Sequence, residues 1–470
     1  MDALTDILAY AFWVLLAITI LVFVHEMGHF LFAKLFGMRV DRFSIGFPPR
    51  IFGKKIGETE YVIGATPLGG YVKIAGMVDE SMDAEFEASE PQPWEFRSKP
   101  VWQRIVVITA GVVFNVLLAC FIFIGLKYVY GESYIPAENV RAVYVEEGSL
   151  AYEMGLRTGD RIVAVSGTRP ERFSDLLDVQ ALLADPFTIT VERNGETITF
   201  QGPDDIITQL NRSQGSLGIS FSPSLVGGVM PGSAAEEAGL QRWDRVVRIG
   251  EEPVQFWQQM TEMIQRVGRT PVTIRWERPD SLVQQATTTA QVVARRAGVT
   301  IYEAEVVPQY YDPEDRYLLG VTAPDEAMLA QEFGVRHKDY GLGEAIRAGL
   351  VDTWVNTRAT AVSLGRVFSG RENLRENLGG PIMVAQVTKQ AAEAGARSFW
   401  FIVAMLSITL AIVNILPIPA LDGGHLVFLL YEGITRREPS LRVRMAMQQI
   451  GMILLLAFMT FLIFNDILRL

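Results

Sequence analysis

The sequence has little cysteine, little histidine and no excess of basic charge. One cysteine, Cys120, occurs among 470 residues, so no disulfide can form within the chain. The formal net charge is −11, which argues against a nucleic acid as partner. Only four histidines occur, so any pattern among them is informative. What the chain has in quantity is apolar sequence, because 49% of its residues are hydrophobic.

Charge is also missing from four long stretches, residues 7–24, 105–126, 398–421 and 445–465. Each is long enough to cross a bilayer, which takes about 20 apolar residues as a helix. The leader of the first stretch is acidic and no small-residue cleavage site follows the stretch, which is unlike a signal peptide. The sequence therefore predicts an α-helical polytopic membrane protein with four transmembrane helices.

Basic residues gather in three clusters, at 34–55, 97–104 and 436–444. In a protein with four spans, all three clusters fall on one side of the membrane. The rule that basic loops stay inside assigns that side to the cytoplasm. We therefore expect both termini and the long middle region to lie on the outer side.

The middle region, 128–341, contains an internal repeat. GSLAYEMGLRTGDRIVAV begins at Gly148, and GSAAEEAGLQRWDRVVRI begins 84 residues later at Gly232. A strand-like run follows each copy, so the region predicts two copies of one β-rich module.

Both copies resemble PDZ domains, which bind an extended peptide at a sheet edge. The second copy departs from that pattern, because Trp243 stands where the family has glycine. SLGISF, residues 216–221, resembles the carboxylate-binding loop and edge strand of the second copy. Binding of a peptide C-terminus by at least one copy and a purely steric role both remain open.

VFVHEMGHFLF, residues 22–32, places two histidines and a glutamate in an apolar run. His25 and His29 are four residues apart, so on a helix both side chains project from one face. Two imidazoles at this spacing can hold one Zn²⁺, with Glu26 beside them to accept a proton from water. The alternative is a pair of buried histidines with an incidental glutamate. Ionisable side chains next to a membrane core mark function by default, which favours the metal site.

A catalytic zinc site needs a third protein ligand and one position open for water. NILPIPALDGGH, residues 414–425, contains Asp422, the first charge after the third uncharged stretch, and His425 one turn later. We expect this end of the third span to lie at the same depth as His25. Asp422 is the favoured ligand and His425 its competitor, while a helix N-cap is the structural alternative for Asp422. His337, far from any span, is interpreted as an ordinary residue of the soluble region.

Three motifs together resemble the site-2 protease family of intramembrane zinc metalloproteases. They are HEMGH in the first span, AGVVFN (110–115) in the second and NILPIPALDGG in the third. GGYVKIAG (69–76) and LGGPIMVAQ (378–386) fit the same family. Four spans with tandem PDZ modules are similar to a branch of this family found in bacterial inner membranes, which acts in regulated intramembrane proteolysis and stress response.

The resemblance implies roles for individual residues. His25, His29 and Asp422 become the ligands of one zinc ion, and Glu26 becomes the catalytic base. Asn414 and Asn115 become polar groups near the substrate or the developing oxyanion.

Residues 59–74, TEYVIGATPLGGYVKI, combine a β-branched run, a proline, a glycine pair and a second apolar run. This pattern predicts a hairpin or a curved β-loop. An ordinary cytoplasmic hairpin is one interpretation. The resemblance implies a re-entrant β-element in which Gly69, Gly70 and Tyr71 pair with an unwound substrate.

Two functions follow from these observations. The favoured one is an intramembrane zinc endopeptidase in the bacterial inner membrane, with its active site near the cytoplasmic side and its PDZ modules on the outer side. By resemblance, its substrate is a single-span membrane protein already trimmed outside, such as an anti-sigma factor, or a signal-peptide remnant. The alternative is a non-catalytic membrane receptor that binds peptide C-termini through its PDZ modules.

The expected organisation has eight parts. In order they are the first transmembrane helix (1–36), the β-loop with an acidic linker (37–100), the second transmembrane helix (101–130), the first PDZ domain (131–214), the second PDZ domain (215–310), an outer linker with amphipathic helices (311–397), the third transmembrane helix (398–430), and a basic loop with the fourth transmembrane helix (431–470). One of the amphipathic helices is expected at 344–368, where it lies on the membrane surface or packs on the PDZ modules.

Overall fold

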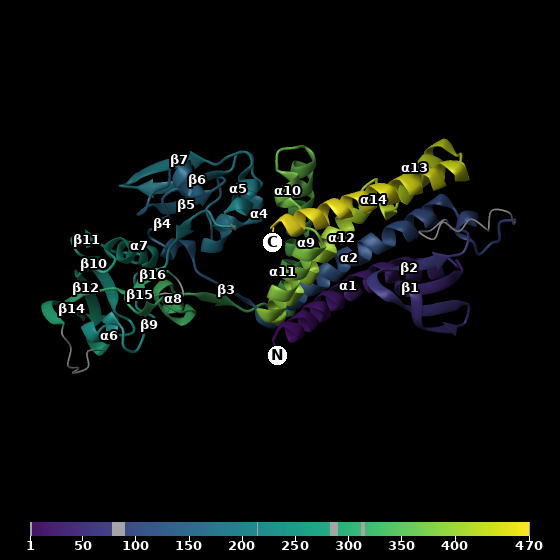
Figure 1. Ribbon diagram of the computed structural model, residues 1–470. Coiled ribbons are helices and arrows are strands. Elements are labelled where there is room, and N and C mark those ends of the chain that lie inside the picture. The colour runs from purple at the N-terminus through teal and green to yellow at the C-terminus, as the bar shows by residue number, and fades with distance from the viewer. Residues whose placement is uncertain (1, 78–89, 214, 283–289, 312–314, 470) are drawn as a thin grey trace. The chain divides into compact units, whose positions relative to one another are not determined.

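The computed structural model describes residues 2–77, 90–213, 215–282, 290–311 and 315–469. The chain divides into a mainly helical unit, Met1–Glu132 with Asp339–Leu470, and a mainly β-stranded unit, Ser133–Lys338 (Figure 1). Most of the predicted acidic linker falls in 78–89, outside the described residues.

Among the described residues, four helices are long and apolar enough to cross a membrane, and each overlaps one of the four predicted stretches. They are α1 (Asp2–Leu35), α2 (Val101–Tyr130), α12 (Ala396–Ile415) and α14 (Leu441–Arg469). The third helix is shorter than predicted. It ends at Ile415 because Pro417 and Pro419, which have no N–H to donate, interrupt the helical hydrogen bonds. A separate helix, α13 (Asp422–Thr435), follows the break.

The helical unit is organised around α2, which packs against both α1 and α12 (Figure 1). The predicted helix at 344–368 is α9 (Leu342–Phe368), and it packs along α2. Small residues allow this approach, because a Cβ on Gly349 would overlap with Ile124. The opposite face stays apolar and open, with Trp354 70% exposed. The remaining short helices of this unit are η2 (Phe96–Ser98), α10 (Leu374–Asn377) and α11 (Pro381–Glu393).

A small curved sheet lies against α1. It is built from two long bent strands, β1 (Val40–Ile56) and β2 (Thr59–Ile74). The first half of β1 lies between the two halves of β2, since Ser44 pairs with both Val62 and Tyr71. Of the two predicted forms of 59–74, the hairpin is wrong, because the first half of β1 separates the two arms. The curved β-loop agrees with the structure, since 59–74 form one bent strand. Residues 70–74 form one edge of this sheet.

The β-stranded unit holds the two repeats, which have matching cores. The first repeat contains the sheet β5-β6-β7 and the pair β4-β8, and the second contains the sheet β11-β10-β12-β14-β13 and the pair β9-β17. The elements are β3 (Glu132–Tyr134), η3 (Ala137–Asn139), β4 (Tyr144–Val145), α3 (Leu150–Met154), β5 (Arg161–Val165), η4 (Phe173–Leu177), α4 (Val179–Leu182), β6 (Thr188–Arg193), β7 (Glu196–Gln201), α5 (Ile206–Arg212), β8 (Ile219–Ser220), β9 (Gly228–Val229), α6 (Ala234–Ala238), β10 (Arg245–Ile249), β11 (Glu252–Pro253), α7 (Trp257–Val267), β12 (Val272–Pro279), η5 (Asp280–Leu282), β13 (Gln291–Arg296), β14 (Val299–Val306), β15 (Gln309–Tyr311), β16 (Arg316–Leu318), β17 (Val321–Thr322), α8 (Glu326–Phe333) and β18 (Arg336–Lys338).

The repeated Asp-Arg dipeptide has a structural role in both copies. Asp160 is buried and accepts hydrogen bonds from Arg193, and Asp244 is buried and accepts them from Arg278. In each pair the guanidinium compensates a carboxylate that has lost its water. Trp243, the departure from the glycine pattern, has a left-handed backbone with φ of 76°.

The predicted boundary between the repeats at 214 is wrong. Leu217 is buried in the core of the first repeat, and its carbonyl accepts a 2.9 Å hydrogen bond from the N–H of Ala151. SLGISF therefore closes the first repeat and not the second. The matching bond in the second repeat runs from the N–H of Ala235 to the carbonyl of Leu319, also at 2.9 Å. The second repeat thus extends beyond residue 310, because each copy is completed by a strand that returns to its own beginning.

Candidate metal centre

The two histidines of HEMGH lie one turn apart on α1 and face the same side. Both are buried, with 8% of each residue exposed, and their Nε2 atoms are 3.2 Å apart. Nδ1 of His29 donates to the carbonyl of Val107 on α2 at 2.8 Å, once it carries the proton. That bond leaves the lone pair of Nε2 available to a metal.

Asp422 comes to this pair from a distant part of the chain. It is the first residue of α13, directly after the break that the two prolines cause, and Leu421 holds the N-cap position. Its Oδ2 lies 3.2 Å from Nε2 of His25 and 3.5 Å from Nε2 of His29. Within the described part of the chain, these three residues are the one group of metal-ligand side chains found to converge.

The three side chains fit a zinc ion. Their ligand atoms all lie within 4.8 Å of one another. Oδ2 of Asp422 is buried and has no hydrogen-bond partner, a costly state for a carboxylate that has no cation beside it. Two imidazole nitrogens and one carboxylate oxygen are a common ligand set of catalytic zinc, which leaves a fourth position open.

A cavity of about 130 Å³ opens beside the three ligands. Glu26 and Asn414 both line it, and Nδ2 of Asn414 lies 3.4 Å from Nε2 of His25. His425, the competitor for the third ligand, lines the same cavity but is not part of the converging group.

Asn115 occupies a different place from the one predicted. It is fully buried behind the His25 ring, where its amide nitrogen lies 3.2 Å from Nδ1, the ring nitrogen that faces away from Asp422. A side chain in this position does not reach a substrate in the cavity. The predicted contact of Asn115 with substrate is therefore wrong.

The edge of the small sheet forms another wall of the cavity. Tyr71 and Val72 line it, and Gly70 lies so close to α1 that a Cβ there would be 2.8 Å from Val22 and 3.4 Å from Glu26. Gly69 instead faces the ring of Phe47. Of the three predicted β-loop residues, Tyr71 thus contacts the cavity, and Gly70 allows the strand to approach α1.

Gly111 of α2 makes room for both histidines. A Cβ on Gly111 would be 2.6 Å from Cε1 of His25 and closer still to Nε2 of His29. Sequence reasoning missed this role, although Gly111 belongs to the AGVVFN motif. Its position four residues after Val107 and four before Asn115 places all three on one face of α2.

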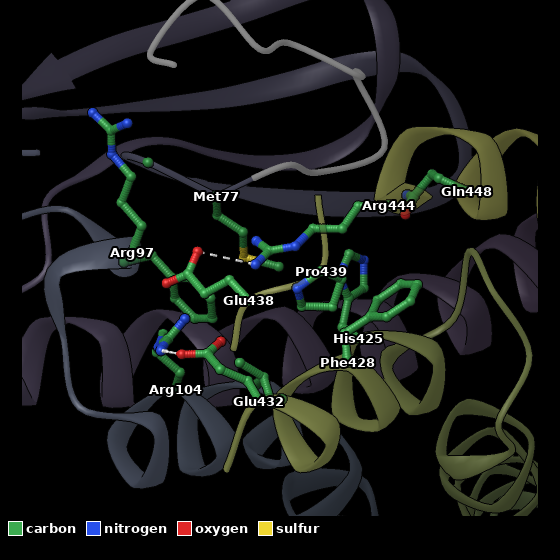
Figure 2. A pocket seen from close by; sticks show the side chains of 13 residues that line it. Met77, Arg97, Arg104, His425, Phe428, Glu432, Glu438, Pro439, Arg444 and Gln448 are labelled. Atoms are coloured by element: carbon green, nitrogen blue, oxygen red, sulfur yellow. Dashed lines mark hydrogen bonds and ion pairs between the residues drawn. The ribbon is translucent and has the colours of Figure 1, made fainter. Parts of the chain in front are cut away.

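A second cavity of about 140 Å³ adjoins the first, and Met77 and His425 line both (Figure 2). Arg104 of α2 pairs there with Glu432 of α13, and Arg444 pairs with Glu438 (Figure 2). Sequence reasoning missed Glu432. The available signal was a second carboxylate in α13, ten residues after Asp422 in a largely apolar run, a position where charge needs a partner.

Comparison with known proteins identifies the family of this chain. Residues 13–458 match peptidase family M50. The regulator of sigma-E protease RseP of Salmonella typhimurium is 32% identical over 475 residues, which cover 97% of this chain and 98% of that protein. A protein of Neisseria meningitidis named as a zinc metalloprotease is 31% identical over 469 residues, with 97% and 98% covered. The chain therefore belongs to peptidase family M50, the site-2 protease family, and is a zinc-dependent membrane peptidase.

Proposed function

We propose that this peptidase cuts the transmembrane segment of single-span membrane proteins, with His25, His29 and Asp422 as the ligands of one zinc ion. The observation that carries the proposal is the convergence of these three side chains, beside Glu26, in one cavity among membrane-spanning helices. A metal site that only stabilises the fold has no need of a carboxylate base, and this disfavours a non-catalytic receptor.

The residues of the cavity divide the chemistry among them. When bound, zinc would act as a Lewis acid, which polarises the scissile carbonyl and lowers the pKa of water. Glu26 accepts the proton of the attacking water and later delivers it to the leaving amine. Asn414 donates a hydrogen bond to the carbonyl oxygen as negative charge develops on it.

A peptide bond inside a membrane helix must first lose its helical hydrogen bonds, which is costly in lipid. The edge at 70–74 lies along the cavity and has β1 as its one strand partner within the described residues. We propose that the unwound substrate pairs with the other side of this edge as an added strand.

The substrates we propose are single-span proteins already shortened on the outer side, of the anti-sigma-factor kind, and signal-peptide remnants. The names of the sigma-E-regulating relatives support the first class. We propose that the catalytic cavity lies near the cytoplasmic side of a bacterial inner membrane and the two repeats outside, which the three basic clusters support.

We propose that both repeats are PDZ modules and that the second receives a peptide C-terminus or screens substrates by size. In the second repeat, a cavity of about 380 Å³ lies between α7 and residues 316–323, lined by Met260, Ile264 and Leu319 among others. In the first repeat, the corresponding place is filled by the chain itself. The ring of Phe333 lies 5.1 Å from that of Phe221, which lies 4.4 Å from that of Phe173.

The test compares Glu26→Gln with Glu58→Gln, which changes an exposed carboxylate in the turn between β1 and β2. In purified enzyme, Glu26→Gln should keep the zinc content of the wild type and lose cleavage of a transmembrane substrate by about a hundredfold or more. Glu58→Gln should change neither measurement. A Glu26→Gln enzyme that cuts at the wild-type rate would contradict the proposal, and a wild type that binds zinc and cuts nothing would favour the receptor.

A further inference from the structure

In both histidine rings, the nitrogen that points away from Asp422, Nδ1, contacts the same face of α2. The carbonyl of Val107 lies 2.8 Å from Nδ1 of His29, and the amide of Asn115 lies 3.2 Å from Nδ1 of His25. The two α2 positions are eight residues apart, two helical turns, and Gly111 lies midway between them on the same face, against both rings. The partner of His29 is a backbone group, whereas the partner of His25 is a side chain.

The Asn115 amide has an orphaned atom. The residue is fully buried, and its Oδ1 has no hydrogen-bond partner while its Nδ2 faces the ring. If Nε2 of His25 holds a metal, Nδ1 must carry the ring's proton and act as a donor. Two donors would then face each other. Because the two ends of an amide are nearly indistinguishable in shape, a half-turn of the amide replaces this conflict with a hydrogen bond to Oδ1.

We propose that Asn115 is a positioning residue whose Oδ1 accepts the Nδ1–H of His25 and holds that ring in the tautomer that presents Nε2 to zinc. The proposal rests on the metal site described above. It replaces the role in substrate contact that the motif implied for Asn115. Mutation of a residue that hydrogen-bonds to a metal ligand typically lowers metal affinity by about 10–100-fold.

The carbonyl of Gly111 also lies close to the His25 ring and is the competing acceptor. A backbone carbonyl survives substitution at 115, so the two acceptors can be told apart. Asn115→Leu removes the side-chain acceptor at similar volume, and Asn115→Asp keeps it. Ser407→Ala is the matched control, because the Ser407 hydroxyl donates to the backbone carbonyl of Asn115 at 2.8 Å and does not involve the amide.

The experiment measures zinc affinity of the full-length protein in detergent by competition with a chelator. Asn115→Leu should weaken zinc about 10–100-fold, while Asn115→Asp and Ser407→Ala stay within a few-fold of wild type. Wild-type zinc affinity in Asn115→Leu would overturn the proposal and make the carbonyl of Gly111 the acceptor. An equal loss of zinc affinity in Asn115→Leu and Asn115→Asp would also overturn it, because Asn115 would then act through packing alone. His25→Ala tests the metal site itself. Unchanged zinc affinity in this variant would show that His25 is not a ligand, and the proposed metal site would then fail together with the role of Asn115. Thermal unfolding of the metal-free variants shows that each has folded.

Discussion

Arg104 and Glu432 form a buried ion pair that joins α2 to α13, the helix that begins with Asp422. The exposed fractions of the two residues are 4% and 7%, and Nη2 of the arginine donates to Oε1 of the glutamate. The helix that supplies one ligand is therefore fastened to the helix that supports the other two.

Glu432→Gln should destabilise the protein, because it leaves the buried charge of Arg104 without compensation. Removing one partner of a buried pair costs about 3–5 kcal/mol. Glu438→Gln is the control, since its pair with Arg444 is half-exposed and should be worth about 1 kcal/mol or less. Thermal unfolding in detergent measures both, and equal midpoints for the two variants would contradict a structural role for the buried pair.

Asp466→Ala should loosen α11 from α14. Asp466 is 3% exposed and accepts hydrogen bonds from the N–H groups of Gly380, Ile382 and Met383 at 2.9, 2.9 and 3.1 Å. Its loss leaves buried donors without an acceptor, at a cost of about 1–3 kcal/mol. Denaturant unfolding should show this loss, whereas Thr460→Ala, which changes an exposed hydroxyl on the same helix, should not. A stable Asp466→Ala variant would mean that water replaces the carboxylate.

Single prolines at Tyr71 and Val72 should have different effects. Successive N–H groups of a strand point to opposite edges, so one of the two residues donates towards β1 and the other towards the proposed substrate. Proline removes the donor in each case. One variant should lose stability, and the other should keep its unfolding midpoint and zinc content but lose cleavage. If cleavage and stability fall together in both variants, the edge serves folding only.

Peptide binding to the second repeat is testable with a fluorescent decapeptide ending in Ala-Val and its C-terminally amidated form. Thr261→Glu places a negative charge on the wall of the second cavity and should weaken the free-acid peptide about tenfold or more. Phe333→Ala should add a second binding site per chain, because it removes one of the rings that fill the corresponding place in the first repeat. Fluorescence anisotropy gives affinity and stoichiometry. Equal binding of the amidated peptide would argue against capture of a carboxylate.

Local patterns of sequence were sufficient for several features. The four spans follow from uncharged length, the face shared by His25 and His29 follows from their spacing, and the two repeats follow from self-similarity. Each of these depends on residues close together in the chain, or on a comparison of the chain with itself, and needs no knowledge of distant contacts.

Other features were decided by tertiary structure alone. The sequence favoured Asp422 over His425 as the third ligand, and the fold brings Oδ2 of Asp422 to the two Nε2 atoms. The fold also placed β1 between the arms of a predicted hairpin and Asn115 behind a ligand. These outcomes depend on contacts between residues as far apart in the chain as 25 and 422. Which of these contacts form depends on how much apolar surface is buried and which hydrogen bonds are made in the whole packed chain, and no local pattern of sequence contains that information.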